Sequence, residues 1–210
     1  MSAAISIGDL VDAAMKGIAA AHTDFQKWSG GSWLWEAPEY LATVYVAREL
    51  ARLKGTKFIS LERNARRALR DAGAIARGPI HKHVRASGRF DLLLFWASGT
   101  PRAPIEVKGW VNQYKAIAAD MRRLEEVIHR AEDTSSLQFG LMVFHTSARD
   151  DRTFSAAEKL TKWISNIESE AHEVIPSRTA IRLQSRRLTV EGDSAWTAVS
   201  ILLKPTRGSP

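Results

Sequence analysis

The segment from 88 to 110, GRFDLLLFWASGTPRAPIEVKGW, constrains the fold of this chain more than any other part of the sequence. It holds two apolar runs that are too short and too rich in β-forming residues to be helices. Between them lies Ser-Gly-Thr-Pro at 98–101, a composition typical of turns. We therefore predict an antiparallel hairpin with strands at 89–97 and 104–110.

Charged residues interrupt both predicted strands. Asp91 precedes the apolar run 92–96, and a carboxylate there is costly to bury unless it is paired or binds a cation. Alternate side chains of a strand share a face, so Glu106 and Lys108 point the same way while Val107 points into the core. A partner or a cation must therefore compensate Asp91.

The pairing of the hairpin decides whether the two acids meet. If the strands pair symmetrically about residues 98 and 99, Asp91 and Glu106 are directly opposite, roughly 5 Å apart at Cα, a span that one metal ion can bridge. Prolines at 101 and 104 leave this register open. Mg²⁺ usually takes one or two protein carboxylates, which these acids would supply. Lys108 would then orient the attacking water or stabilise developing charge.

This pattern resembles the PD-(D/E)xK nuclease superfamily, whose core is a helix, three meandering strands, a helix and a further strand. Asp91, Glu106 and Lys108 match its Asp and Glu-x-Lys positions. The resemblance implies that Asp91 and Glu106 ligate Mg²⁺, for which Mn²⁺ can substitute, and that Lys108 assists the attacking water. Phe90 stands where the superfamily's name has a proline, a difference that the chemistry tolerates. For the motif alone, the competing interpretation is a solvated hairpin edge.

Periodicity and turn residues predict the other elements. An amphipathic helix at 7–22 packs on the core, and a loop at 28–35 follows it. Further helices are predicted at 38–53, 64–71, 112–132 and 156–171, an extended or looped stretch at 75–87, and further strands at 57–62, 139–146, 182–190 and 195–203, the last two as a closing hairpin. The sum is a mixed α/β domain with helices flanking a central sheet.

From 38 to 146, the order of the predicted elements is that of the superfamily core, which implies a restriction-endonuclease-like fold. The chain then divides into an N-terminal helix at 1–27, a nuclease-like domain at 28–205 and a disordered tail at 206–210. The length of 210 residues suits one such domain.

Members of the superfamily often add an acid from the first core helix to the metal site. Glu36, Glu39 and Glu49 are available here, and Glu62 is a weaker candidate at the end of its strand. Glu39 is favoured because it lies at the helix start, where the chain can approach the sheet. The alternative role for Glu39 is stabilisation of the helix N-terminus by its negative charge.

The helix after the Glu-x-Lys strand carries Gln113 and Tyr114. Glutamine and tyrosine there resemble the RecB-like branch, although in that branch a helical turn separates them. Gln113 is predicted to orient a phosphate or a water, with an ordinary solvated helix start as the alternative. Arg122 and Arg123 are predicted to form a solvated charged face.

A formal net charge of +7 and a pI near 9.9 favour a polyanionic partner. The basic run before Asp91 is the preferred phosphate contact, and the residues assigned to it are Lys82, His83, Arg85 and Arg89. His81 and His83 could instead bind zinc, but two further ligands are lacking. Tryptophans 28, 33 and 35 are predicted to stack bases, form a lid or plug the core.

The absence of cysteine fits a reducing interior, and no apolar run approaches the roughly 20 residues that span a bilayer. We therefore expect a cytoplasmic protein with no membrane partner, and a homodimer or a partner protein stays open. The sequence predicts a Mg²⁺-dependent nuclease that cleaves DNA in preference to RNA. The alternative is an inactive nucleic-acid-binding or assembly module with a nuclease-like fold.

Overall fold

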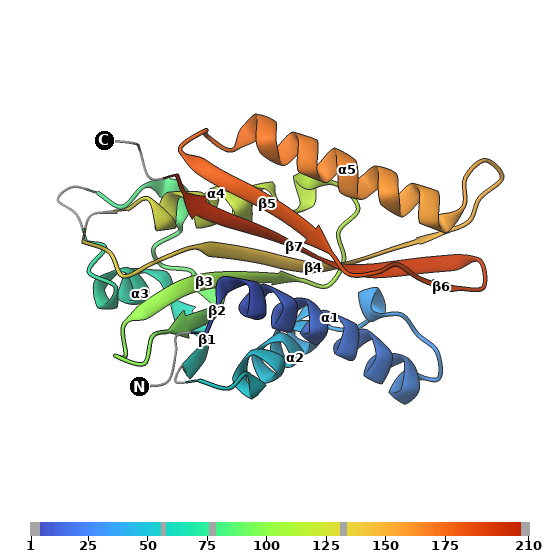
Figure 1. Cartoon of the computed structure of the whole chain (residues 1–210), viewed down its shortest axis with the longest axis horizontal. Helices are drawn as coiled ribbons and strands as arrows, with labels where there is room; N and C mark the ends of the chain where they lie inside the picture. The colour runs from blue at the N-terminus through green and yellow to red at the C-terminus, as the bar shows by residue number, and fades with distance from the viewer. Residues whose placement is uncertain (1–4, 56–57, 76–78, 131–133, 207–210) are drawn as a thin grey trace.

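The computed structural model describes residues 5–55, 58–75, 79–130 and 134–206. These residues form a seven-stranded sheet with helices on both faces (Figure 1). The prediction of a mixed α/β domain is therefore confirmed. The tail predicted to be disordered lies, apart from residue 206, outside the described residues.

The sheet has the order β1-β2-β3-β4-β7-β5, and β6 pairs with β7 beside this path. Strands β3 and β4 are parallel, whereas all other neighbours are antiparallel. A parallel pair needs a crossover connection, and helix α4 lies in the connection between β3 and β4. The strands are β1 Phe58–Asn64, β2 Arg89–Phe95, β3 Pro101–Lys108, β4 Gly140–Arg149, β5 Thr179–Ser185, β6 Thr189–Glu191 and β7 Ser194–Pro205.

The helices form two layers around the sheet. The α-helices are α1 Ile7–Ser29, α2 Glu39–Arg52, α3 Ala65–Asp71, α4 Ala118–Ile128 and α5 Ala156–Val174, and the 3₁₀ turns are η1 Leu34–Glu36, η2 Lys82–Val84 and η3 Tyr114–Ala116. Alternate residues of β4 serve opposite cores: Leu141 and Val143 pack with α1 and α2, whereas Met142 and Phe144 pack with α4 and α5. None of the helices in the described ranges has the length and apolar character needed to cross a membrane.

Helix α1 confirms the predicted packing on the core but is longer than predicted. Its buried residues end at His22, which is where the apolar periodicity ends, yet the helix continues to Ser29. Gly30 terminates it in the left-handed conformation, with φ of 74°. Trp28 therefore lies in a helix and not in the predicted loop.

Helix α1 also fixes the position of α2. A Cβ atom on Gly17 would lie 2.5 Å from the Cα of Val46, so only glycine allows the two helices to approach this closely. Any other residue at position 17 would displace α2, the helix that carries Glu39.

Several other predicted elements have different bounds. The predicted strand 104–110 is β3, Pro101–Lys108, so Gly109 and Trp110 lie beyond its end. Helix α4 begins at Ala118 because 114–116 form a 3₁₀ turn whose Tyr114 is buried in the second core. The predicted strand 182–190 is divided into β5 and β6: Ser185 pairs with Val199 but Thr189 pairs with Trp196, so one extra residue interrupts the ladder. Both parts still pair with β7, which extends the predicted closing hairpin.

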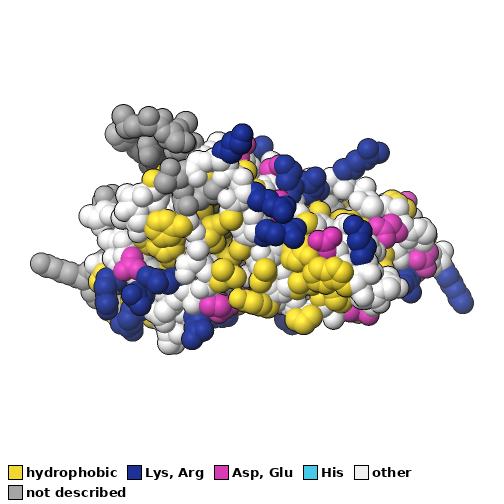
Figure 2. Space-filling model, turned by 90° about the horizontal axis from the view of Figure 1, so that it is seen from below, with side chains coloured by type: hydrophobic (Ala, Val, Ile, Leu, Met, Phe, Trp, Pro, Cys, Tyr) yellow, Lys and Arg dark blue, Asp and Glu magenta, His cyan; other side chains and the backbone are white. Residues whose placement is uncertain are grey.

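The outer surface of α2 and β1 is partly apolar. Seen from the side of α1 and α2, hydrophobic side chains gather between separate groups of charged residues (Figure 2). Val44, Phe58 and Leu61 line a shallow hollow there. Strand β1 is an edge strand of the sheet, so this surface lies beside unpaired backbone groups.

A buried histidine pair links α1 to the sheet. The ring of His22 stacks on that of His145 in β4 at 4.9 Å between centroids, and Trp196 lies 4.1 Å from His22. The backbone N–H of Leu34 donates to His22 Nδ1 at 3.4 Å. Burial lowers the pKa of His22 to about 4, although Glu191 opposes the shift. Burial, with the neighbouring His22, lowers the pKa of His145 well below its ordinary value.

This pair predicts a loss of stability in mild acid. The unfolded chain binds a proton at His22 near pH 6.5, but the folded chain does so only near pH 4. Stability is therefore fully present above the unfolded pKa and is lost as the pH falls toward 4. Between pH 7 and 5, His22 alone should lower the free energy of unfolding by roughly 2 kcal/mol. Urea denaturation at the two pH values measures this loss.

His22→Gln keeps an acceptor for the Leu34 N–H and should show a smaller difference between the two pH values. His172 lies exposed on α5, so His172→Gln should keep the wild-type difference. Equal pH dependence in all three proteins would contradict the assignment to His22.

Candidate functional site

Asp91 and Glu106 are adjacent across the β2–β3 hairpin. Leu92 pairs with Ile105, so the next position outward places Asp91 opposite Glu106, as symmetric pairing predicted. The only irregularity in this pairing within the described residues lies between Leu94 and Phe95, toward the turn. Asp91 Oδ2 accepts a hydrogen bond of 2.7 Å from the backbone N–H of Val107.

The two carboxyl groups share a buried, electronegative environment. Burial raises the pKa of Asp91, and the Val107 N–H and Lys108 only partly offset this. Glu106 is 3% exposed, and its burial together with the charge of Asp91 raises its pKa well above the ordinary value. Two adjacent acids that are both hard to ionise form a site where a cation would favour the charged forms.

Lys108 lies at the centre of a group of acids. Its Nζ is 3.3 Å from Glu39 Oε1 and 3.3 Å from Asp120 Oδ2. Burial alone would lower the pKa of Lys108, but Asp120, Glu39 and Asp91 outweigh burial and raise it. Lys108 is therefore an ammonium group at neutral pH, able to donate hydrogen bonds but not to accept a proton.

Glu39 reaches Lys108 from the first residue of α2. Its Oε2 also accepts a hydrogen bond of 3.2 Å from the backbone N–H of Gly109. The other acids considered for this role have different surroundings. Glu36 accepts from the Trp33 N–H, and Glu49 pairs with Arg48 and Arg52. Glu62 is exposed on β1 at the position opposite Asp91, between the pairs Leu61–Leu92 and Arg63–Phe90. Of the four, Glu39 is the acid that contacts the Glu-x-Lys strand.

Arg123 is buried, contrary to the prediction of a solvated face. Its Nη1 donates to Glu106 Oε1 at 2.9 Å and to the Arg89 carbonyl at 2.8 Å, and its Nε donates to the Val84 carbonyl at 3.1 Å. The prediction was wrong for Arg123 because its partner on β3 is distant in sequence. It holds for Arg122, which is exposed.

Asp120 is a further site residue, for which the sequence pattern predicts no role. It accepts from Lys108 and also lies 3.4 Å from Arg85 Nη1, so Arg85, Asp120, Lys108 and Glu39 form a continuous series of ion pairs. A usable signal was present: Asp120 and Arg123 precede buried Val127 at helical spacing. This spacing places both polar residues on an inward face of α4.

The remaining predicted residues are less closely associated with the acids. Of the basic run, Arg85 reaches the site, whereas Lys82, His83 and Arg89 are at least partly exposed beside it. His81 stacks on His83 and pairs with Glu126 at 3.4 Å. Gln113 is exposed before η3, and within the described residues none of its hydrogen bonds reaches the acids.

The side chains were compared with the needs of a bound metal ion. Within the described ranges, no group of three or more His, Asp or Glu residues is arranged to hold one. One carboxylate oxygen of Glu106 accepts a hydrogen bond from Arg123, and one of Glu39 accepts a hydrogen bond from Lys108. Mg²⁺ needs only one or two protein carboxylates, and Asp91 and Glu106 are two adjacent hard-oxygen groups with raised pKa values. These two carboxyl groups therefore fit Mg²⁺, and in the part of the chain that the structure describes no zinc-type ligand group accompanies them.

Comparison of the chain with protein-family models, with curated proteins and with solved structures gave no significant match. The assignment of a function therefore depends on the geometry of the site.

The Arg123–Glu106 pair predicts a large and specific effect on stability. Arg123→Met leaves Glu106 buried without its partner, which should cost about 3–5 kcal/mol in the free energy of unfolding. Arg122→Met, one residue away and exposed, should change it by less than about 0.5 kcal/mol. Urea unfolding of both variants measures the difference.

Adding Glu106→Gln to Arg123→Met should recover part of the loss, because it removes the unpaired charge. Equal stability of the Arg122 and Arg123 variants would show that the ion pair does not contribute to the fold.

Proposed function

We propose that this chain is a Mg²⁺-dependent nuclease of the PD-(D/E)xK type that hydrolyses phosphodiester bonds. One observation carries the proposal. Asp91 and Glu106 lie on adjacent strands with raised pKa values, and Lys108 beside them is held by an acid from a separate helix, Glu39. A hairpin edge with no role would be solvated, whereas Glu106 is 3% exposed.

The order and pairing of the elements support the same proposal. Helix α2 precedes an antiparallel meander of β1, β2 and β3, then α4 leads to β4, which is parallel to β3. The superfamily that the sequence resembles has this order of elements. We accordingly propose a restriction-endonuclease-like core, with α1 and the strands β5 to β7 as additions to it.

Each residue has a distinct role in the proposed reaction. Asp91 and Glu106 would hold Mg²⁺, which when bound polarises a phosphoryl oxygen and acidifies a water. The Lys108 ammonium donates hydrogen bonds to the attacking water or to the phosphoryl oxygen, where negative charge develops. Glu39 and Asp120 position the Lys108 side chain through their contacts of 3.3 Å. Arg85, paired with Asp120, lies where it can contact a phosphate.

A second function has one observation in its favour. The guanidinium of Arg123 already neutralises Glu106, as expected of a nucleic-acid-binding or assembly module that has no metal ion. Such a module would keep the fold and the basic surface but would not cleave nucleic acid. The preference for DNA over RNA comes from the resemblance alone.

The nuclease proposal predicts cleavage that needs both the ion and three residues. Purified protein should cleave DNA in Mg²⁺ or Mn²⁺ and not in EDTA. Asp91→Asn, Glu106→Gln and Lys108→Ala should each lower the rate by at least about 100-fold, because each removes a metal ligand or the donor to the reacting oxygens. Gel assays on supercoiled, linear and single-stranded DNA, and on RNA, measure the rate.

Glu173→Gln is the matched control, since Glu173 is an exposed acid of α5, and it should cleave at the wild-type rate. Each variant is used only if its circular dichroism spectrum matches that of the wild type. Cleavage that survives in EDTA or in folded Asp91→Asn would refute the proposed mechanism. DNA binding without cleavage in any metal would favour the binding module.

Glu39 gives a separate prediction, because two roles are possible for it. If its carboxylate contributes to ion binding, Glu39→Gln should raise the Mg²⁺ concentration needed for half-maximal cleavage several-fold. If it acts through Lys108 alone, the maximal rate should fall at an unchanged Mg²⁺ requirement. We expect the first result, measured by titrating Mg²⁺ at saturating DNA. Glu49→Gln, on the same helix, should behave as wild type.

If Glu39→Gln cleaves normally across the titration but melts at a lower temperature, Glu39 only stabilises the start of α2. That role contributes about 0.3–1 kcal/mol to the free energy of unfolding.

A further inference from the structure

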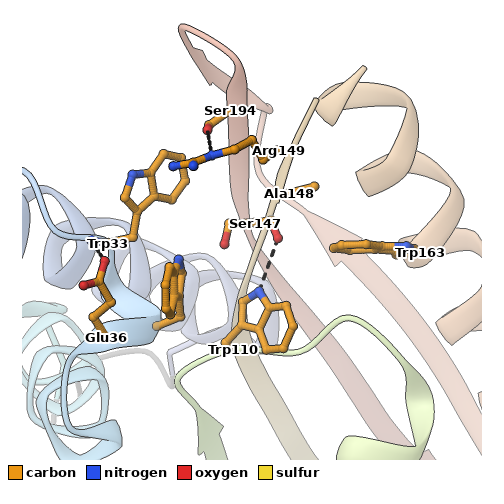
Figure 3. Close-up of a pocket in the computed structure, with 9 residues that line it drawn as sticks. Trp33, Glu36, Trp110, Ser147, Ala148, Arg149, Trp163 and Ser194 are labelled. Carbon is orange, nitrogen blue, oxygen red and sulfur yellow. Dashed lines mark hydrogen bonds between the residues drawn. The ribbon is translucent and has the colours of Figure 1, made fainter. Parts of the chain in front are cut away.

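A cavity lined by tryptophan adjoins the candidate site. It has a volume of about 600 Å³, and its wall includes Trp33, Trp35, Trp110 and Trp163 together with Glu36 and Arg149. Figure 3 shows Trp33, Trp110 and Trp163 arranged around this space, with Arg149 above Ser147 and Ala148. The indoles come from three separate parts of the chain: η1 and the residue before it supply Trp33 and Trp35, the segment just after β3 supplies Trp110, and α5 supplies Trp163. Their convergence is therefore a product of the fold.

Two short stretches of chain connect the walls of the cavity to the site. Trp110 follows Lys108 by two residues, and its indole N–H donates to the Ser147 carbonyl at 3.2 Å, which fixes the ring against β4. Glu36 precedes Glu39 by three residues, and its carboxylate accepts from the Trp33 N–H at 3.1 Å. The cavity thus lies beside the Glu39–Lys108 contact.

Not all of these tryptophans serve as core plugs. Trp33 does pack on buried His22, with 5.1 Å between ring centroids. Trp35 and Trp110, in contrast, are 53% and 42% exposed in the wall of the cavity. Large aromatic surfaces left open to water around a cavity are typical of a ligand site.

We propose that this cavity receives an unpaired nucleobase of the strand whose phosphate lies at Asp91, Glu106 and Lys108; this inference rests on the proposed function. Every base has a flat π-face that can stack on indole. A paired base inside a duplex does not present that face. The Arg149 side chain is 72% exposed at the rim, where its Nε lies 3.7 Å from a carboxylate oxygen of the exposed Asp193. An adjacent phosphate could contact its guanidinium in competition with that exposed carboxylate. The preferred substrate is therefore single-stranded or locally unpaired nucleic acid.

Binding in EDTA tests this proposal without cleavage. Fluorescence anisotropy should show that Trp35→Ala and Trp163→Ala bind a labelled single-stranded oligonucleotide at least about five-fold more weakly than wild type. Their affinity for the matching duplex should not change. Trp28→Ala is the matched control, because Trp28 is 64% exposed on α1 and lies outside the cavity. It should bind both substrates as wild type does.

An abasic scan locates the base. A strand with one abasic residue, moved along its length, should lose affinity for the wild type at one position, and Trp35→Ala should be insensitive to that position. Unchanged single-strand affinity in both folded tryptophan variants, or equal affinity at all abasic positions, would overturn the proposal. Tryptophan-dependent strand binding without cleavage in any metal would leave the base site standing and reject the nuclease. Cleavage that does not depend on the tryptophans would support the nuclease and reject the base site.

Discussion

The buried negative charge of the β2–β3 hairpin is the constraint on which the rest of this structure depends. Asp91 and Glu106 lie opposite one another where solvation is weak. Burial raises the pKa of both carboxyl groups, and the charge of Asp91 raises the pKa of Glu106 further. Burial of such a pair is unfavourable unless cations approach it. Arg123 approaches from α4 and Lys108 from β3 itself. Contacts from α4, from the turn before β2 and from the start of α2 all converge on this hairpin.

The Arg123–Glu106 ion pair, which favours the folded state, would compete with a metal ion for the Glu106 carboxylate. The guanidinium of Arg123 is itself held by carbonyl groups of Val84 and Arg89 and lies 4.3 Å from the ring of Phe90, so it is a fixed cation rather than a mobile counterion. A metal ion at Asp91 would have to share Glu106 with it. Mg²⁺ is suited to such sharing, because it keeps several waters and needs few protein ligands. A site built for a fully protein-coordinated ion would have to exclude Arg123.

Local patterns determine the parts of this fold that could be predicted from the sequence. The alternation of β3 and the turn at 98–101 fix the hairpin, and the helical periodicities fix the two layers. Asp120 and Arg123 were not recognised as site residues, because their partners Lys108 and Glu106 lie on another element and only the packing of α4 brings them together. The end of α1 was misjudged for a related reason. The part of α1 after His22 carries no buried apolar stripe, but Asp24 in that part accepts a hydrogen bond from Tyr45 of α2.

The distribution of charge bears on the affinity that the proposed base site would contribute. A net charge of +7 suggests binding dominated by phosphate contacts. Many of the arginines are nevertheless paired within the fold, as Arg85 is with Asp120, Arg178 with Glu125 and Arg186 with Asp12. A phosphate must compete with those carboxylates, which reduces the free energy that each contact contributes. Base stacking is independent of this competition. In the proposed base site the tryptophans would therefore supply affinity that the paired arginines do not, and only for a strand whose bases are exposed.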